Sequence, residues 1–460
     1  MTAADRDLTR PPPPLSEVER LSPEDLRRLQ ERLLLAQLHY LRSKSTFYQK
    51  KLAAADVSWS SIQRVEHLAD VPFTLKQELR DSLAAAPPFG EHLAADPRDL
   101  VQMQASSGTT GSPSYVGLTA SDLQQWKDMA ARSLGAAGVR PGDRVLHGFS
   151  MSKGFVGGIP MFQGVQHLGA LNIPIGADGG VDRLLVAARD LRVDCIMATP
   201  NFLGYMAEVA METIGVAART LGVRRLVVGG EPGGSIPALR NQLEERWGAK
   251  SCEVLGGTDA GVVFYAECDH QRGMHMVAPD LILTELIDPQ SGEVVPFQPG
   301  ASGELVYTSL GRQASPILRF RTGDHVDVLD THCPCGRTGP LIRCVGRTDD
   351  MLIVRGVNLF PSAIQDVVGE LRPNVTGVMR VVADFEGHST QQNLKVLVER
   401  DETANPLEDG QLASEIERRL RARLSVKTDV RIVSANTFEK PGAKKVSLTL
   451  RALPNGIDPR

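Results

Sequence analysis

The sequence contains no long apolar run. No stretch approaches the roughly 20 apolar residues that a membrane-spanning helix needs. The N-terminus from Met1 to Asp7 also lacks the basic segment followed by an apolar one that marks a secretory signal. These absences predict a cytoplasmic protein without a membrane partner.

The chain also lacks a strong net charge. Its 51 basic and 55 acidic residues give a formal charge of -4, so there is no electrostatic reason to expect nucleic acid as a partner. With 460 residues, 42% hydrophobic and 23% charged, the composition is that of a soluble enzyme with more than one structural unit. Neither number fixes an oligomeric state, and a homodimer stays open.

Cysteine is scarce, with six residues in the whole chain. Such a number does not form a disulfide framework, and clustered thiols in a reducing compartment indicate metal binding or catalysis. Tetrahedral zinc accepts a Cys3His ligand set. The candidate zinc ligands are Cys268, His275, Cys333 and Cys335, with His270 and His332 as competitors for the histidine position. Buried, inert thiols are the alternative.

Apolar stretches alternate with helical patterns in the middle of the chain. The predicted strands are 145–149, 171–175, 194–199, 225–228 and 250–255, and helices are predicted at 181–191 and 200–216. Strands separated by crossovers of this length indicate right-handed βαβ units and largely parallel sheets. Residues 280–330 have the shorter, turn-separated pattern of β-hairpins.

The two ends of the chain have different patterns. Residues 1–14 end in four prolines and are predicted to be a flexible N-terminus. A long amphipathic helix is predicted from Pro23 to Tyr48, with Ser22 as its N-cap. The last hundred or so residues have the pattern β-β-α-β-α-β, with helices at 362–371 and 409–424, and indicate a smaller second domain.

One loop of small residues has the composition of a phosphate-binding segment. It comprises Ser106, Ser107, Gly108, Thr109, Thr110 and Gly111. Glycines let the backbone approach phosphate oxygens closely, and the hydroxyl and backbone N–H groups supply donors. An ordinary polar turn is the alternative.

Five short motifs together resemble the adenylate-forming enzymes, specifically the phenylacetate-coenzyme A ligase branch. They are S-S-G-T-T-G at Ser106, G-G-E-P at Gly229, G-G-T-D at Gly256, R-F-R-T-G-D at Arg319 and G-R-T-D-D at Gly346. The resemblance implies joining of a carboxylate to ATP with release of pyrophosphate, followed by displacement of AMP by a thiol. The stretch P-F-T-L-K-Q-E-L-R at Pro72 is also similar to that branch.

The resemblance implies a role for each motif residue. Residues 106–111 would hold the phosphates, Asp259 would bind Mg2+, and Thr258 would contact a phosphate. Asp324 would accept both ribose hydroxyls, because a carboxylate is an acceptor only. The remaining nucleotide residues would be Gly230, Glu231, Pro232, Leu255, Gly256, Gly257 and Arg347. A helix cap for Asp259 and a turn for Asp324 are the alternatives.

The resemblance also implies an α/β fold in two domains. Residues 15–348 would form a large domain of mostly parallel sheets with a small barrel-like β region. Residues 349–460 would form a small, mobile α+β domain that rotates about a hinge at Asp349, the alternative being a plain linker.

Three positions depart from the family pattern. Ser112 replaces a lysine in the phosphate loop, and Leu255 replaces a tyrosine that stacks on adenine. Gly442 stands where the family has the lysine that bridges acid and α-phosphate, so Lys440 or Lys444 would have to replace it. These departures leave a slow enzyme, or one with a different acceptor, as alternatives.

The resemblance also implies an acid pocket, which would comprise Ser152, Lys153, Phe155 and Gly157. The predicted function is ATP-dependent activation of an aromatic or arylacetic acid, then transfer to coenzyme A. One alternative keeps the adenylation but transfers the acyl group to an amine, a carrier-protein thiol or a small inorganic nucleophile. Another is a degenerate nucleotide-binding protein, which would need no hinge. Specificity lies in the pocket, so the resemblance does not name the acid.

Overall fold

The computed structural model describes residues 16–106, 114–152, 154–231, 233–438 and 447–452. Its N-terminal helices are α1 (Pro23–Lys44), α2 (Thr46–Ala54) and α3 (Lys76–Ala85). Ser22 caps α1 as predicted, accepting a hydrogen bond from the Asp25 N–H at 3.1 Å. The prediction of one helix to Tyr48 is wrong, because Ser45 accepts a hydrogen bond from the Tyr48 N–H and starts α2.

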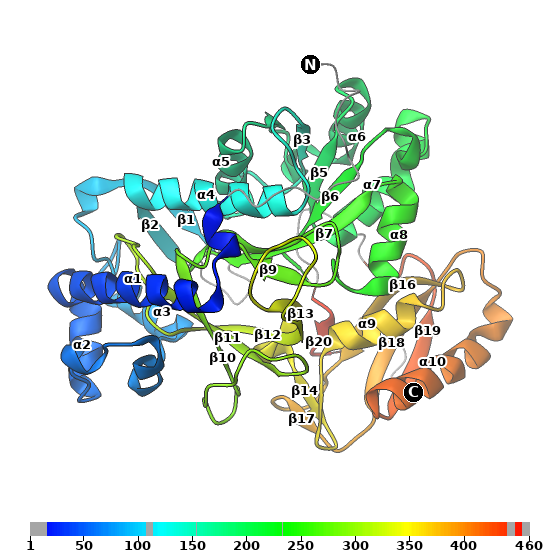
Figure 1. Cartoon of the computed structure of the whole chain (residues 1–460). Coiled ribbons are helices and arrows are strands. Elements are labelled where there is room, and N and C mark those ends of the chain that lie inside the picture. Colours follow the sequence, from blue (N-terminus) through cyan, green and yellow to red (C-terminus); the bar gives the residue numbers. More distant parts are fainter. Residues whose placement is uncertain (1–15, 107–113, 153, 232, 439–446, 453–460) are drawn as a thin grey trace.

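A single sheet of eleven strands forms the centre of the molecule (Figure 1). Its parallel half contains, in spatial order, β4 (Leu171–Ile173), β3 (Arg144–His147), β5 (Cys195–Ala198), β6 (Arg225–Val228) and β7 (Lys250–Gly257). Its antiparallel half continues with β8 (Gly261–Glu267), β9 (Met274–Met276), β13 (Leu341–Arg347), β12 (Phe320–Asp330), β11 (Ser302–Ser309) and β10 (Ile282–Ile287). The predicted parallel strands and the hairpin-like region are both present. Their union in one sheet was not predicted.

Helices cover both faces of the parallel half. Successive side chains of a strand point to opposite faces, so Val145 packs into one hydrophobic core and Leu146 into another. The first core includes α4 (Ala120–Ala136) and α5 (Ile159–His167). The second includes α6 (Val181–Asp190), α7 (Pro200–Ile214) and α8 (Pro237–Trp247). Burial on both faces explains why these strands are continuous apolar runs.

A separate two-stranded hairpin carries Ser106 at its end. It pairs β1 (Leu100–Ala105) with β2 (Tyr115–Thr119) in antiparallel fashion. The Ser106 N–H donates to the Ser114 carbonyl at 2.8 Å, and the Ser114 N–H donates to Ser106 Oγ at 2.9 Å. These bonds join Ser106, the first residue of the predicted phosphate loop, to Ser114, the residue before β2.

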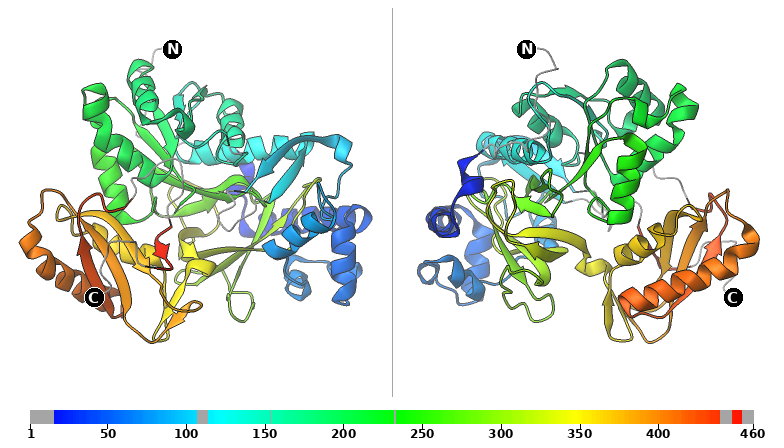
Figure 2. Two further views of the ribbon diagram at one scale, coloured as in Figure 1. Left: turned by 180° about the vertical axis from the view of Figure 1, so that it is seen from behind. Right: turned by 45° about the vertical axis from the view of Figure 1, so that its right-hand side comes forward.

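The C-terminal part forms a smaller lobe with its own core (Figure 2). Its elements are β14 (Leu352–Val354), β15 (Val357–Leu359), α9 (Pro361–Gly369), β16 (Val375–Val382), β17 (Ser389–Thr390), β18 (Leu394–Arg400), α10 (Asp409–Leu424), β19 (Thr428–Val433) and β20 (Thr449–Leu450). Both predicted helices are present, but the predicted order has four strands where the described residues form seven, because one strand was predicted between α9 and α10 in place of three and one after α10 in place of two. Within the described ranges, no helix is long and apolar enough to cross a bilayer.

Candidate active site

A cavity of about 250 Å³ lies at the carboxyl ends of the parallel strands. This edge is where open α/β sheets bind ligands. The predicted residues that line it are Ser106, Phe155, Gly157, Gly230, Glu231, Leu255, Gly256, Gly257, Thr258, Asp259, Asp324 and Arg347. The fold thus gathers residues from all five motifs into one site.

Nine predicted site residues lie outside the described residues. They are Ser107, Gly108, Thr109, Thr110, Gly111, Lys153, Pro232, Lys440 and Lys444, and the departures Ser112 and Gly442 lie outside as well. Their roles stay predictions.

The two glycines at the end of β7 serve the cavity in different ways. A Cβ at Gly256 would lie 2.1 Å from the Val262 carbonyl oxygen, so a side chain there would separate β7 from β8. A Cβ at Gly257 would meet nothing within 4 Å. Because Gly257 lines the cavity, its missing side chain leaves room for a ligand to approach the backbone.

Asp259 lies in the turn between β7 and β8, and not at a helix cap. Its side chain is 9% exposed, and its Oδ2 lies 3.0 Å from Lys76 Nζ. Its Oδ1 is buried and makes no hydrogen bond within the described part of the chain. An unpartnered buried carboxylate oxygen fits the predicted Mg2+ ligand, since this cation prefers oxygen donors.

Two cations near Asp259 are additions to the predicted site. Lys76 lines the cavity. The buried Arg312 guanidinium is not part of the cavity wall and donates a hydrogen bond to the Ala260 carbonyl at 3.1 Å. Lys76 belongs to the stretch at Pro72 that resembles the family. That resemblance was the only sequence signal for Lys76, because no motif gave it a chemical role.

Asp324 and Arg347 are neighbours on β12 and β13. The strand register pairs them, and Arg347 Nη1 lies 3.4 Å from Asp324 Oδ1. Arg347 Nε also donates to Asp349 Oδ1 at 2.7 Å. Burial lowers the pKa of Arg347, but the hydrogen bond to Asp349 and the charge of Asp324 outweigh it and raise that pKa. Arg347 therefore connects the cavity to the predicted hinge.

One region of the cavity is apolar. Its wall includes Phe149, Phe155, Val156 and Met161, which suits a hydrophobic acid. Ser152 was predicted to face this pocket but does not line the cavity.

The segment that contains Ser152 is held by Asp178, which the sequence did not indicate. The N–H groups of Met151 and Ser152 donate to Asp178 Oδ2 at 2.8 and 3.1 Å. The Ser150 hydroxyl also donates to the Asp178 carboxylate at 2.8 Å. Burial raises the pKa of Asp178, but these three donors outweigh it and lower that pKa. The carboxylate thus fixes the backbone that leads to Phe155.

Glu253 is a buried acid in the cavity wall that the motifs did not single out. It is 5% exposed, and its Oε2 makes no hydrogen bond within the described residues. Burial, and next the nearby charge of Glu267, raise the pKa of Glu253 to about 7. Near neutral pH the site therefore contains a carboxyl group that can donate a hydrogen bond.

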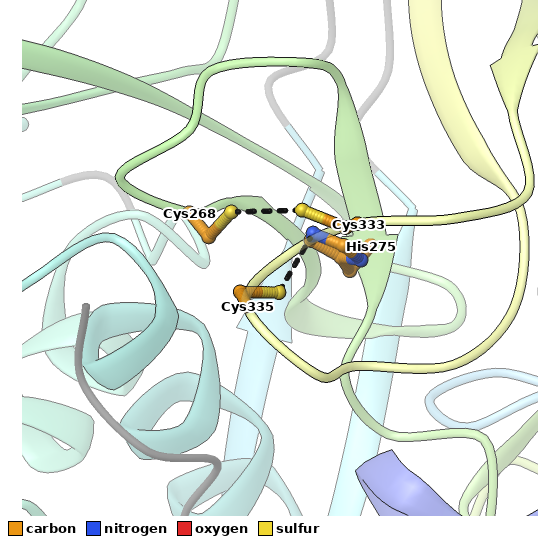
Figure 3. A group of neighbouring side chains, drawn as sticks. All are labelled: Cys268, His275, Cys333 and Cys335. Carbon is orange, nitrogen blue, oxygen red and sulfur yellow. Dashed lines mark hydrogen bonds between the residues drawn. The ribbon is translucent and has the colours of Figure 1, made fainter.

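The predicted zinc ligands converge in a second, separate cluster (Figure 3). Their four ligand atoms all lie within 4.8 Å of one another, and His275 contributes the histidine. The sulfur atoms of Cys268 and Cys333 are 3.6 Å apart, and Cys335 Sγ lies 3.5 Å from His275 Nε2. Tetrahedral bonds to zinc of about 2.3 Å for sulfur and 2.0 Å for nitrogen give edges of roughly 3.5 to 3.8 Å. The side chains present therefore fit that metal.

Comparison with known proteins identifies the family. Residues 26–311 match the model of the AMP-binding enzyme family, and residues 356–449 match that of the AMP-binding enzyme C-terminal domain. The chain belongs to the AMP-binding enzymes. It is an ATP-dependent, AMP-forming ligase, and the resemblance to the phenylacetate-coenzyme A ligase branch is confirmed.

Two relatives illustrate the similarity within this family. A phenylacetate-coenzyme A ligase from Thermus thermophilus is 37% identical over 83% of this chain and 83% of its own length. Another from Aromatoleum evansii is 31% identical over 93% of this chain and 95% of its own length.

The fold also matches a solved AMP-binding enzyme in more than one state. The crystal structure of 2-hydroxyisobutyryl-CoA ligase in its postadenylation state is similar with a TM-score of 0.88 and 27% identity, over 97% of this chain and 95% of that one. The same ligase in its thioesterification state gives a TM-score of 0.69 with 28% identity, over 97% and 94%.

Proposed function

We propose that this ligase activates an aromatic or arylacetic acid as its acyl-adenylate and then transfers the acyl group to coenzyme A. The observation that carries the proposal is the shared cavity, with Asp259 and Asp324 in its wall beside the apolar surface of Phe149 and Phe155. The relatives named phenylacetate-coenzyme A ligases support the arylacetic acid and coenzyme A.

In the first half-reaction an oxygen of the acid would form a bond to the α-phosphorus of ATP. The bond from that phosphorus to the bridging oxygen breaks, and pyrophosphate leaves with the electron pair. Asp324 would hold the ribose, and Ser106 and Thr258 would donate to phosphate oxygens. Asp259 would bind Mg2+, which neutralises charge on those oxygens. In the second half-reaction the thiol sulfur would attack the acyl carbon, and AMP would leave.

We infer that the described pose is the adenylating one. The higher similarity to the postadenylation state of 2-hydroxyisobutyryl-CoA ligase than to its thioesterification state supports this inference. Residues 349–460 would rotate about Asp349 relative to residues 15–348, presenting Arg355 and Gly356 to the cavity for thioester formation.

Zinc bound by Cys268, His275, Cys333 and Cys335 would have a structural role and not a catalytic one. The cluster joins the turn after β8 and strand β9 to the loop after β12. The same loop after β12 also contacts the N-terminal segment. The Thr338 N–H donates to the Glu19 carbonyl at 2.9 Å, and Arg337 forms a fully buried ion pair with Glu19. A metal there would hold these segments together.

The test is turnover of ATP with a panel of aromatic and arylacetic acids, with and without coenzyme A. We expect acid-dependent pyrophosphate release and a coenzyme A thioester identified by mass. Pyrophosphate without a thioester would contradict the acceptor and favour an amine, carrier-protein thiol or inorganic nucleophile. No acid-dependent pyrophosphate would contradict the aromatic substrate class, and a failure to bind ATP as well would indicate a degenerate site.

A further inference from the structure

Lys76 has a fixed backbone beside the cavity. Lys76 is the first residue of α3. Thr74, two residues before it, pairs with Phe320 on β12, the strand that carries Asp324. The Thr74 N–H donates to the Arg319 carbonyl at 2.9 Å, and the Arg321 N–H donates to the Thr74 carbonyl at 3.0 Å. The P-F-T-L stretch thus delivers a lysine to the site from outside all five motifs.

The Lys76 ammonium and the Arg312 guanidinium lie on the turn that carries Asp259. The Lys76 ammonium lies 3.0 Å from Asp259 Oδ2, and the buried Arg312 guanidinium donates to the Asp259 and Ala260 backbone carbonyls. Asp122 and then Asp259 are the acidic charges that act most on Arg312. An anion that enters this part of the cavity would therefore meet the Lys76 ammonium, and low-dielectric walls strengthen the attraction between them.

Lys76 is also free to change partner. Of the cations among the described lining residues, Arg347 is held by Asp324 and Asp349. Lys76 has a side chain that is 35% exposed, and within the described ranges of the chain its ion pair is with Asp259 alone. Thr258 and Ser106, the predicted phosphate contacts within the described residues, line the same cavity.

We propose that Lys76 is a catalytic residue of adenylation that leaves Asp259 for a phosphate oxygen of ATP. Asp259 would hold Mg2+ through its unpartnered oxygen, and the cation would supply the counter-charge that the Lys76 ammonium gives up when it changes partner. The ammonium then stabilises negative charge on the phosphate while the acid oxygen bonds to the α-phosphorus and pyrophosphate leaves. Lys76 keeps its proton throughout. This role rests on the proposed function, and it supplies a cation that the Ser112 departure removes from the phosphate loop.

The test compares Lys76→Met and Lys76→Arg with a matched control, Lys50→Met. Lys50 is another exposed lysine in an ion pair, 2.8 Å from Glu91 and outside the cavity wall. Calorimetry without acid would measure binding of Mg2+ with α,β-methylene-ATP, and binding of Mn2+ alone. Pyrophosphate release would measure the rate, and thermal unfolding would check that each variant is folded.

We expect Lys76→Met to weaken binding of the ATP analogue about tenfold and to slow adenylation about a hundredfold, as for loss of one charge-stabilising donor. Mn2+ alone should bind at least as tightly as in wild type, because Asp259 loses its competing ammonium. Lys76→Arg should recover most of the analogue affinity, and Lys50→Met should match wild type.

Analogue binding by Lys76→Met within twofold of wild type would overturn the proposal. Parallel loss of Mn2+ and analogue affinity would also overturn it, because Lys76 would then only position Asp259. These binding measurements need no acid or acceptor. A wild-type protein that binds the analogue but activates no acid would contradict the proposed function and leave the result for Lys76 standing.

Discussion

Asp324 and Arg347 lie opposite each other on adjacent strands, with Arg347 Nη1 3.4 Å from Asp324 Oδ1. The same guanidinium holds Asp349 at 2.7 Å, just beyond the end of β13. Arg347 thus contacts both Asp324, which would bind the ribose, and Asp349, the proposed hinge. Binding of the ATP ribose to Asp324 would therefore alter the contact between Arg347 and Asp349, the residue about which the C-terminal lobe would rotate.

The ribose assignment predicts that Asp324→Asn binds ATP more weakly. Loss of a charged hydrogen-bond acceptor costs about 1.5–3 kcal/mol, so we expect roughly a 10- to 100-fold increase in the Kd of ATP by calorimetry. Asp327→Asn is the control, since Asp327 lies on the same strand and pairs with Arg343 at 3.0 Å, outside the cavity wall. Unchanged affinity in Asp324→Asn would show that this carboxylate does not hold the nucleotide.

The proposed hinge at Asp349 predicts that Asp349→Pro separates the two half-reactions. Proline fixes φ near -65°, so it should block a rotation about this residue. We expect acid-dependent pyrophosphate release within about threefold of wild type and thioester formation reduced about a hundredfold or more. Asp349→Ala, which leaves φ free, should retain most of the second activity. Equal loss of both half-reactions in Asp349→Pro would contradict the hinge.

The proposed zinc site predicts one bound metal per chain that depends on Cys335. Elemental analysis of purified protein should find about one equivalent of zinc, and Cys335→Ser should lose most of it and unfold at a lower Tm. Cys344→Ser is the control, because Cys344 lies outside the four-residue cluster. Protein that is pure and folded but contains no stoichiometric zinc would remove the metal from this account.

Glu253 predicts a stability that falls as the pH rises. Its pKa is 4.5 in an unfolded chain and about 7 in the folded one, so between these values the folded state binds more protons than the unfolded state. The folded state loses on the order of 3 kcal/mol across that window, at about 1.4 kcal/mol per pKa unit.

Glu253→Gln cannot ionise, and it should lose less stability than wild type between pH 5 and pH 8. Urea unfolding at both pH values measures the difference. Parallel pH dependence in the two proteins would show that Glu253 ionises normally in the fold.

The sequence by itself determined the local elements and the chemistry of the motifs. Ser22 can cap α1 without help from distant residues, because its hydroxyl accepts from a backbone N–H three residues further along. The 3.6-residue pattern of residues 409–424 predicted the bounds of α10 correctly. It failed at Ser45, where a helix-compatible apolar pattern continues across a residue whose hydroxyl starts a new helix. Periodicity records which face is buried, and it does not record competition between a side chain and the backbone for a hydrogen bond.

Only the tertiary structure decided which distant residues meet. Lys76 and Asp259 are 183 positions apart in sequence. The sequence predicted that the cysteines of the second cluster meet, but only the fold decided that His275, and not His270 or His332, is the histidine beside them. Glu253 reads as an ordinary residue of a strand until burial beside Glu267 raises its pKa. Such effects depend on distance and on exclusion of water, and the packing of the whole sheet sets both.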